Sequence, residues 1–172
     1  MVRRRKKASK FIVSGIRTYI DKVGKVTSEI AAEKIVTDLK EAGPYYTGEF
    51  EENWVVLPGD VTIPANKKTS FSATEKWQGW ESGEFPFTRR ITPVQIPPLA
   101  QGQYDYTIGN RMEYRDIALD LVPGRFAVDK NNTAEQDWFL KYVQGGGLRN
   151  ALKEATGQAS RDPQLRGNKG FG

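Results

Sequence analysis

The chain has 172 residues, of which 38% are hydrophobic and 11% aromatic, so it is long enough for one domain with a core of its own and too short for two. It has no cysteine and no histidine, which excludes disulfides, thiolate or imidazole metal ligands, and the histidine-assisted nucleophiles of many enzymes. The formal net charge is +5, but residues 1–10 hold six basic and no acidic side chains, so the rest of the chain sums to −1 and a basic groove within the fold is not indicated.

The first predicted element is a flexible basic arm over residues 1–10. Its consecutive basic residues are Arg3, Arg4, Arg5, Lys6 and Lys7. Such a run would neutralise about five phosphates and give a salt dependence with a slope near −4.5. It would equally serve as a solvated arm, because no aromatic side chain is interleaved with it to stack on bases. Weak nucleic-acid binding and a solubilising role therefore both stay open.

Residues from Ser9 to Ala42 are predicted to form one long helix with two apolar stripes. The first stripe repeats at alternating steps of four and three residues and consists of Ile12, Ile16, Tyr19, Val23, Val26 and Ile30. The second lies roughly 150° around the helix and consists of Ala31, Ala32, Ile35, Val36 and Leu39. Either a kink at Gly24 buries both stripes in one core, or one packs on the domain's own sheet and the other on a neighbouring subunit. In the second case the first stripe is the subunit interface.

The helix is expected to end at Gly43-Pro44, because glycine accepts a left-handed conformation and proline cannot continue the hydrogen-bond ladder. Thr47-Gly48 then reads as a turn. A strand is predicted to follow and to end at residues 57–59. Phe50, Trp54 and Val56 are predicted to share one face of this strand, with Glu52 on the same side at its start.

Residues 61–103 form a long insertion without periodic pattern, rich in proline and aromatic residues. The aromatic residues at its centre are Trp77, Trp80, Phe85 and Phe87. This composition is too aromatic for a solvated linker. The insertion is predicted to be a surface that docks on a partner, or else to pack over the core of its own domain.

The last third of the chain alternates short elements with breaks. Residues 104–109 are predicted to form a strand, and a short helix is expected after Asn110. A further helix is predicted from Thr133 to Val143, with a break at Gly145-Gly146-Gly147 and a continuation from Leu148 to Ala155. Residues 157–172 are polar and glycine-rich, which predicts a flexible tail.

Together these elements predict a single α+β domain over residues 11–156. A long N-terminal helix packs on a small, mainly antiparallel sheet, with the irregular insertion at 61–103 and a C-terminal helix. No apolar run approaches membrane-spanning length and no secretory signal is recognised, so we expect a protein made in the cytoplasm with no membrane contact.

Two groups of carboxylates are candidate ligands for Mg²⁺ or Ca²⁺: Glu49, Glu51 and Glu52 in one, Asp116 and Asp120 in the other. Neither has a partner acid at a defined spacing, so a solvated acidic face explains them better than a cation site. The three glycines at 145–147 lack the lysine and hydroxyl residue of a phosphate-binding loop and are predicted to be a hinge. No metal or cofactor is expected.

Two segments carry a resemblance to a known family. After the long helix comes "GPYYTGEFEENW", and a later strand ends in "YTIGNRMEYRDIALD". This order resembles the neck or tail-completion family of tailed bacteriophages, the minor tail components to which the lambda Z protein belongs. The residues that match the family's motifs are Pro44, Thr47, Gly48, Phe50, Trp54, Asn110, Tyr114 and Leu119.

The resemblance implies a structural virion protein without catalytic activity. It would assemble as a homo-oligomeric ring, a hexamer or a dodecamer, in the neck at the head–tail junction. Its neighbours would be other neck proteins, the portal or the tail-tube protein, with possible contact to packaged DNA. Adaptor, stopper and terminator proteins are all small ring proteins, so the layer of the neck stays open.

The sequence leaves two other functions open. The main rival is a nucleic-acid-binding accessory protein that uses the basic N-terminal arm. The weaker one is a metal-dependent enzyme built on the carboxylates.

Overall fold

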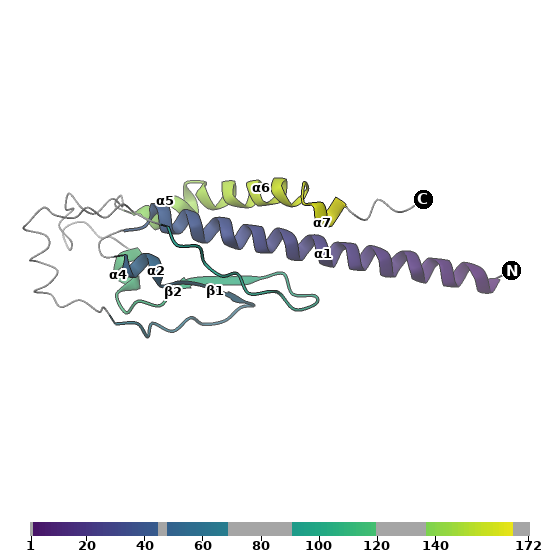
Figure 1. The fold of residues 1–172 in the computed structure, drawn as a ribbon, viewed down its shortest axis with the longest axis horizontal. Coiled ribbons are helices and arrows are strands. Elements are labelled where there is room, and N and C mark those ends of the chain that lie inside the picture. The colour runs from purple at the N-terminus through teal and green to yellow at the C-terminus, as the bar shows by residue number, and fades with distance from the viewer. Residues whose placement is uncertain (1, 45–47, 69–90, 120–136, 167–172) are drawn as a thin grey trace, which may run out of the picture.

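The computed structural model describes residues 2–44, 48–68, 91–119 and 137–166, and the side chains of residues 2–15 lie outside this description. The predicted α+β architecture is confirmed: a long N-terminal helix, a two-stranded antiparallel sheet and a C-terminal helix. In Figure 1 helix α6 lies along helix α1, and strands β1 and β2 form a second layer across the C-terminal half of α1. The elements in order are α1 (Val2–Ala42), α2 (Glu49–Glu52), β1 (Trp54–Pro58), β2 (Tyr106–Asn110), α4 (Arg115–Leu119), α5 (Trp138–Gln144), α6 (Gly147–Ala159) and α7 (Pro163–Arg166).

Helix α1 begins at Val2 and not near Ser9, where its start was predicted, so residues 2–10 of the predicted basic arm are helical in the structure. Arginine, lysine and alanine favour helices, and no glycine or proline interrupts this stretch. The helix ends where predicted, with the Gly43 N–H donating to the Leu39 carbonyl at 3.0 Å. The basic residues 3–7 therefore lie in the first turns of α1.

Helices α1 and α6 run antiparallel and form the main helical contact of the fold (Figure 1). The face of α6 toward the interior consists of Ala151, Ala155 and Ala159, which are all buried and recur at every fourth residue. Small side chains let two helix backbones approach closely. This face continues to Ala159 and α7 follows, so helical structure extends beyond Ala155 into residues 157–166, the first part of the predicted tail.

The predicted break between the C-terminal helices is confirmed at the three glycines. The Gly145 N–H donates to the Lys141 carbonyl at 2.7 Å and ends α5. Gly146 has φ 102°, a left-handed conformation that favours glycine, and α6 starts at the next residue. Residues 133–136, where the start of this helical stretch was predicted, lie outside the described residues.

The sheet pairs β1 and β2 in antiparallel register, from Trp54 opposite Asn110 to Pro58 opposite Tyr106. The prediction of a strand through Phe50 was wrong, because Glu49–Glu52 forms the short helix α2. The turn is closed by the Glu52 N–H, which donates to the Gly48 carbonyl at 2.9 Å, and by Asn53 Nδ2, which donates to the Glu49 carbonyl at 2.7 Å. Phe50 thus reaches the core from a helical turn, while Trp54 and Val56 reach it from β1.

The second apolar stripe of α1 supplies the helical side of the core. The core residues are Ala32, Val36, Leu39, Phe50, Trp54, Val56, Met112, Ala118, Trp138 and Tyr142.

The described parts of the insertion, residues 61–68 and 91–103, contain no helix or strand, and both pack on this domain. Ile63 and Leu99 are buried. The Lys67 N–H donates to the Arg111 carbonyl at 2.9 Å, and the Glu113 N–H donates to the Lys67 carbonyl at 3.0 Å.

Candidate functional site

The two motif segments meet at one buried junction built around Asn110. This side chain is 2% exposed and lies at the end of β2. Its Nδ2 donates to the Phe50 carbonyl at 2.6 Å, and its Oδ1 accepts from the Met112 N–H at 2.9 Å. One amide therefore ties α2, in the first motif segment, to the turn after β2 in the second, sixty residues later in the chain.

Aromatic contacts surround this junction. The Phe50 ring packs edge-on against Trp54, with ring centroids 5.7 Å apart, and stacks on Tyr114 at 6.1 Å. Burial, with a smaller contribution from the Glu49 carboxylate, raises the pKa of Tyr114 to about 12. Tyr114 is thus neutral at physiological pH and acts as a packing residue.

Gly48 precedes this cluster with φ 86°, a left-handed backbone that side chains with a Cβ rarely adopt. Pro44 lies two residues beyond α1 and is half-buried. Leu119 packs against the core. Thr47 lies outside the described residues, as do all four predicted docking residues: Trp77, Trp80, Phe85 and Phe87.

The first apolar stripe of α1 is split by the fold. Ile16 and Tyr19 are 53% and 47% exposed, while Val23, Val26 and Ile30 are half-buried. Ile12 and the basic residues 3–7 belong to the part of α1 whose side chains are not described. The second stripe is part of the hydrophobic core, whereas the first stripe is exposed at Ile16 and Tyr19 and only half-buried farther along α1.

A loop that the sequence did not indicate as a partner of α1 lies against the helix face of Asp21, Gly24 and Ser28, which at about 100° per residue is opposite the first stripe. The loop before β2 crosses α1 and is fixed by Asp21, which accepts from the Gly102 N–H and from the Tyr104 hydroxyl, both at 2.9 Å. Farther along α1, Ser28 donates to the Tyr104 carbonyl. A Cβ on Gly24 would lie 2.6 Å from the Tyr104 ring, so glycine is required there for contact. A glycine inside a long helix was the one available signal of this close approach.

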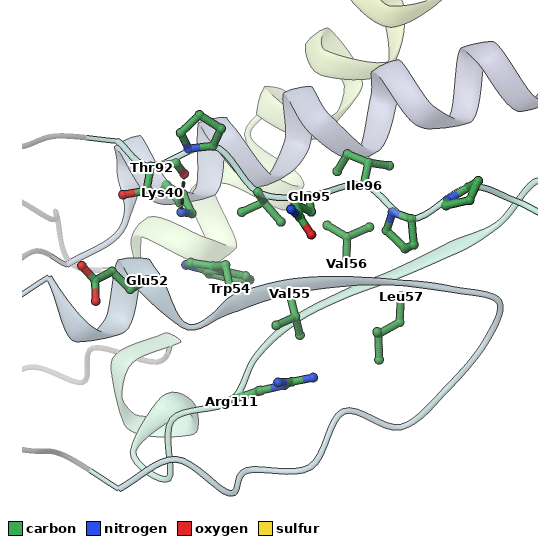
Figure 2. A pocket seen from close by; sticks show the side chains of 14 residues that line it. Lys40, Glu52, Trp54, Val55, Val56, Leu57, Thr92, Gln95, Ile96 and Arg111 are labelled. Atoms are coloured by element: carbon green, nitrogen blue, oxygen red, sulfur yellow. Dashed lines mark hydrogen bonds between the residues drawn. The ribbon is translucent and has the colours of Figure 1, made fainter.

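A groove of about 920 Å³ follows the free edge of β1 and the segment 92–98. Figure 2 shows Trp54 and Val56 on the side of β1 that faces this segment, and Val55, Leu57 and Arg111 on the other side. At its start, this segment is held by hydrogen bonds between Thr92 and the buried charged residues Lys40 and Glu51. Lys40 Nζ donates to the Thr92 carbonyl at 2.7 Å, and the Thr92 N–H donates to Glu51 at 3.4 Å.

This arrangement places two opposite charges inside the protein. Burial lowers the pKa of Lys40, and the Glu51 and Glu52 carboxylates oppose that shift. Glu51 is therefore a structural residue that holds the insertion against α2, and not the solvated carboxylate that was predicted. Farther along, the Tyr106 hydroxyl donates to the Pro97 carbonyl at 2.6 Å and fixes the other end of the segment.

A second groove, of about 480 Å³, opens between the helices and the sheet on the β2 side. Its apolar walls come from α1, β2, α5 and the start of α6: Ile35, Leu39, Ile108, Phe139, Val143 and Leu148. Thr62 and Ile63 border it, and Arg115 fastens this border by donating from Nη1 to the Ile63 carbonyl at 2.6 Å. We call this feature the β2 groove.

Among the described residues, no three histidine, cysteine, aspartate or glutamate side chains come together as metal ligands, and Asp120 lies outside that part of the chain. None of the helices in the described ranges is long and apolar enough to cross a membrane. Comparisons of the chain with family models, with curated proteins and with solved structures find no match.

Proposed function

We propose that the chain is a structural subunit of a tailed bacteriophage, which assembles as a ring in the neck at the head–tail junction. The observation that carries this proposal is the uncovered apolar surface of Ile16 and Tyr19 on a helix whose opposite stripe is already buried. A helix with one stripe in its own core and another in solvent supports a role in contact between subunits.

The uncovered apolar surface supports assembly, and the resemblance to neck proteins supports the neck at the head–tail junction as the place of assembly. The two motif segments of this resemblance are far apart in the chain, and the bond from Asn110 to Phe50 joins them into one structural unit. That arrangement supports treating them as parts of a single motif. In this proposal the subunit is made in the host cytoplasm, has no catalytic activity, and binds neighbouring copies together with portal, neck or tail-tube proteins.

Negative-stain images of the purified wild-type chain test the ring directly. A closed ring of six or twelve copies is expected. Particles of monomer size at every concentration tried would contradict the proposal.

A second candidate function is nucleic-acid binding, and it is favoured by the placement of residues 3–7 in the first turns of α1. In Figure 1 this end of the helix projects beyond the sheet and α6, so a duplex could approach it. Binding that weakens with salt at a slope near −4.5, and that is lost on deleting residues 1–7, is expected of five phosphate contacts. If the deletion leaves DNA retention unchanged, this candidate fails.

A further inference from the structure

The N-terminal end of α1 carries an apolar face that the described part of the fold does not cover. Figure 1 shows this end projecting beyond α6, α7 and the sheet. Ile16, Tyr19 and Ile20 are 53%, 47% and 59% exposed. Three large side chains within five residues form an apolar patch of the kind that marks an interaction surface.

Charge restricts which surface this face can meet. The first twenty residues contain seven basic and no acidic side chains, whereas the other 152 contain 19 basic and 21 acidic ones. Two such helix ends would bring like charges together, which is unfavourable at an interface. The partner surface is therefore an acidic one and not a second helix end.

The β2 groove has the matching properties. Val143 on its wall is 40% exposed, as is Val61 beside its border, so apolar surface is available there. The sheet layer that borders the groove, residues 48–68 and 103–119, carries six acidic and four basic side chains besides the buried Glu51. The exposed Asp116 lies next to the lining residue Arg115.

The helix end cannot fill the groove of its own chain. Ile16 and the groove residue Ile35 lie on the same continuous helix, 19 residues apart. At 1.5 Å per residue they are about 28 Å from each other along a rigid rod. The occupant must come from another molecule.

We infer that the apolar N-terminal end of α1 of one copy docks in the β2 groove of the next copy. The basic residues of the helix end then face the acidic sheet layer. The two surfaces are different, so each subunit uses one of each and the contact is head-to-tail, the kind that closes into a ring. This inference rests on the proposed ring function and names the surfaces that build it.

Two complementary variants test the inference. Ile16→Asp with Ile20→Asp disables the helix end and leaves the groove intact. Thr62→Arg with Asp116→Arg disables the groove by bulk and like charge, at exposed positions, and leaves the helix end intact. Each variant alone is expected to be monomeric by light scattering coupled to size exclusion. Their equimolar mixture is expected to form a dimer of one copy each, because one intact helix end meets one intact groove.

The control is Leu152→Asp, which places an aspartate at a residue of similar exposure, 47%, on α6 and outside both surfaces. It should assemble as wild type does. Circular dichroism checks that every variant is folded. If the paired arginine variant loses helical signal, Asp116→Arg alone makes the same test, since its side chain is 88% exposed.

Three outcomes would overturn the inference. If wild type forms rings and either variant alone still forms them, the surfaces are wrong while the proposed function stands. If both variants are monomeric and their mixture stays monomeric, the contact is not head-to-tail through these surfaces. If wild type itself is monomeric at all concentrations, the ring function fails together with the inference.

Discussion

Replacing Asn110 by alanine tests whether the two motif segments form one structural unit. The change removes the donor to the Phe50 carbonyl and the acceptor for the Met112 N–H, which are both buried. Each buried polar group left without a partner costs about 1–3 kcal/mol. We therefore expect Asn110→Ala to lower the free energy of unfolding by about 2–6 kcal/mol, which is a large share of the stability of a domain of this size.

Urea denaturation followed by circular dichroism measures this loss, provided that the slope of free energy against denaturant is unchanged. Asn150→Ala is the matched control, because Asn150 is exposed on α6 and should change the free energy of unfolding by less than about 0.5 kcal/mol. Asn110→Asp refines the test. It keeps the acceptor for Met112 but directs a carboxylate oxygen at the Phe50 carbonyl.

The pH dependence of Asn110→Asp has a definite sign. Burial and the facing carbonyl raise the folded-state pKa of the new carboxyl group above its unfolded value. The stability that its proton provides is then present below the unfolded pKa and lost as pH rises through the folded value. The variant should lie closer to wild type at pH 4 than at pH 7. An Asn110→Ala variant as stable as the Asn150 control would refute the whole argument.

Further predictions follow from strain, from charge and from the insertion. Gly48→Val should lower the free energy of unfolding by about 1–3 kcal/mol, because φ is 86° there, and an unchanged urea midpoint would show that the backbone is not strained. Gly157→Ala, in an open site on α6, should raise that free energy by up to about 1 kcal/mol in the same assay. The Gly102 N–H, with smaller contributions from the Tyr104 hydroxyl and Lys25, holds the pKa of Asp21 below its usual value, so the stability that ionised Asp21 provides is present above its unfolded pKa and lost as pH falls through its folded pKa. Asp21→Ala should therefore speed amide exchange at Gly102 at pH 7. In acid, wild-type exchange at Gly102, corrected for the intrinsic rate, should approach that of the variant. Limited proteolysis within residues 61–103 should be slower in assembled particles than in the free subunit, and equal rates would end the proposal that this segment docks on a partner.

The sequence predicted those parts of the fold that depend on strong local periodicity. The second stripe of α1 became the core face because large and small apolar residues recur at helical spacing through Leu39. Glycine and proline likewise predicted the end of α1 and the break before α6, since these residues restrict the backbone directly.

Where local pattern was ambiguous, the predictions failed. Phe50 and Trp54 are four residues apart, a spacing that suits one face of a strand and one face of a helix equally, and the helical turn α2 was missed. The inner face of α6 consists of alanines, whose weak apolar pattern did not predict a helix as far as Ala159. The first turns of α1 have high helix propensity but no apolar stripe, so the start of the helix was predicted at Ser9 and not at Val2.

Contacts between distant parts of the chain could not be predicted at all. The Asp21 bond to Tyr104 joins residues 83 positions apart, and the Lys40 bond to Thr92 joins residues 52 apart. No local spacing predicts such pairs. The sequence therefore identified Asn110 as a motif residue but not the bond to Phe50 that explains its place in the motif.

Native mass spectrometry of the wild-type chain tests the central claim most directly. A ring subunit predicts one closed species whose mass is six or twelve times the 19.4 kDa of the chain, at concentrations where Ile16→Asp with Ile20→Asp gives the single-chain mass. A spectrum with the 19.4 kDa species alone, or with an open series of unlimited size, would contradict it.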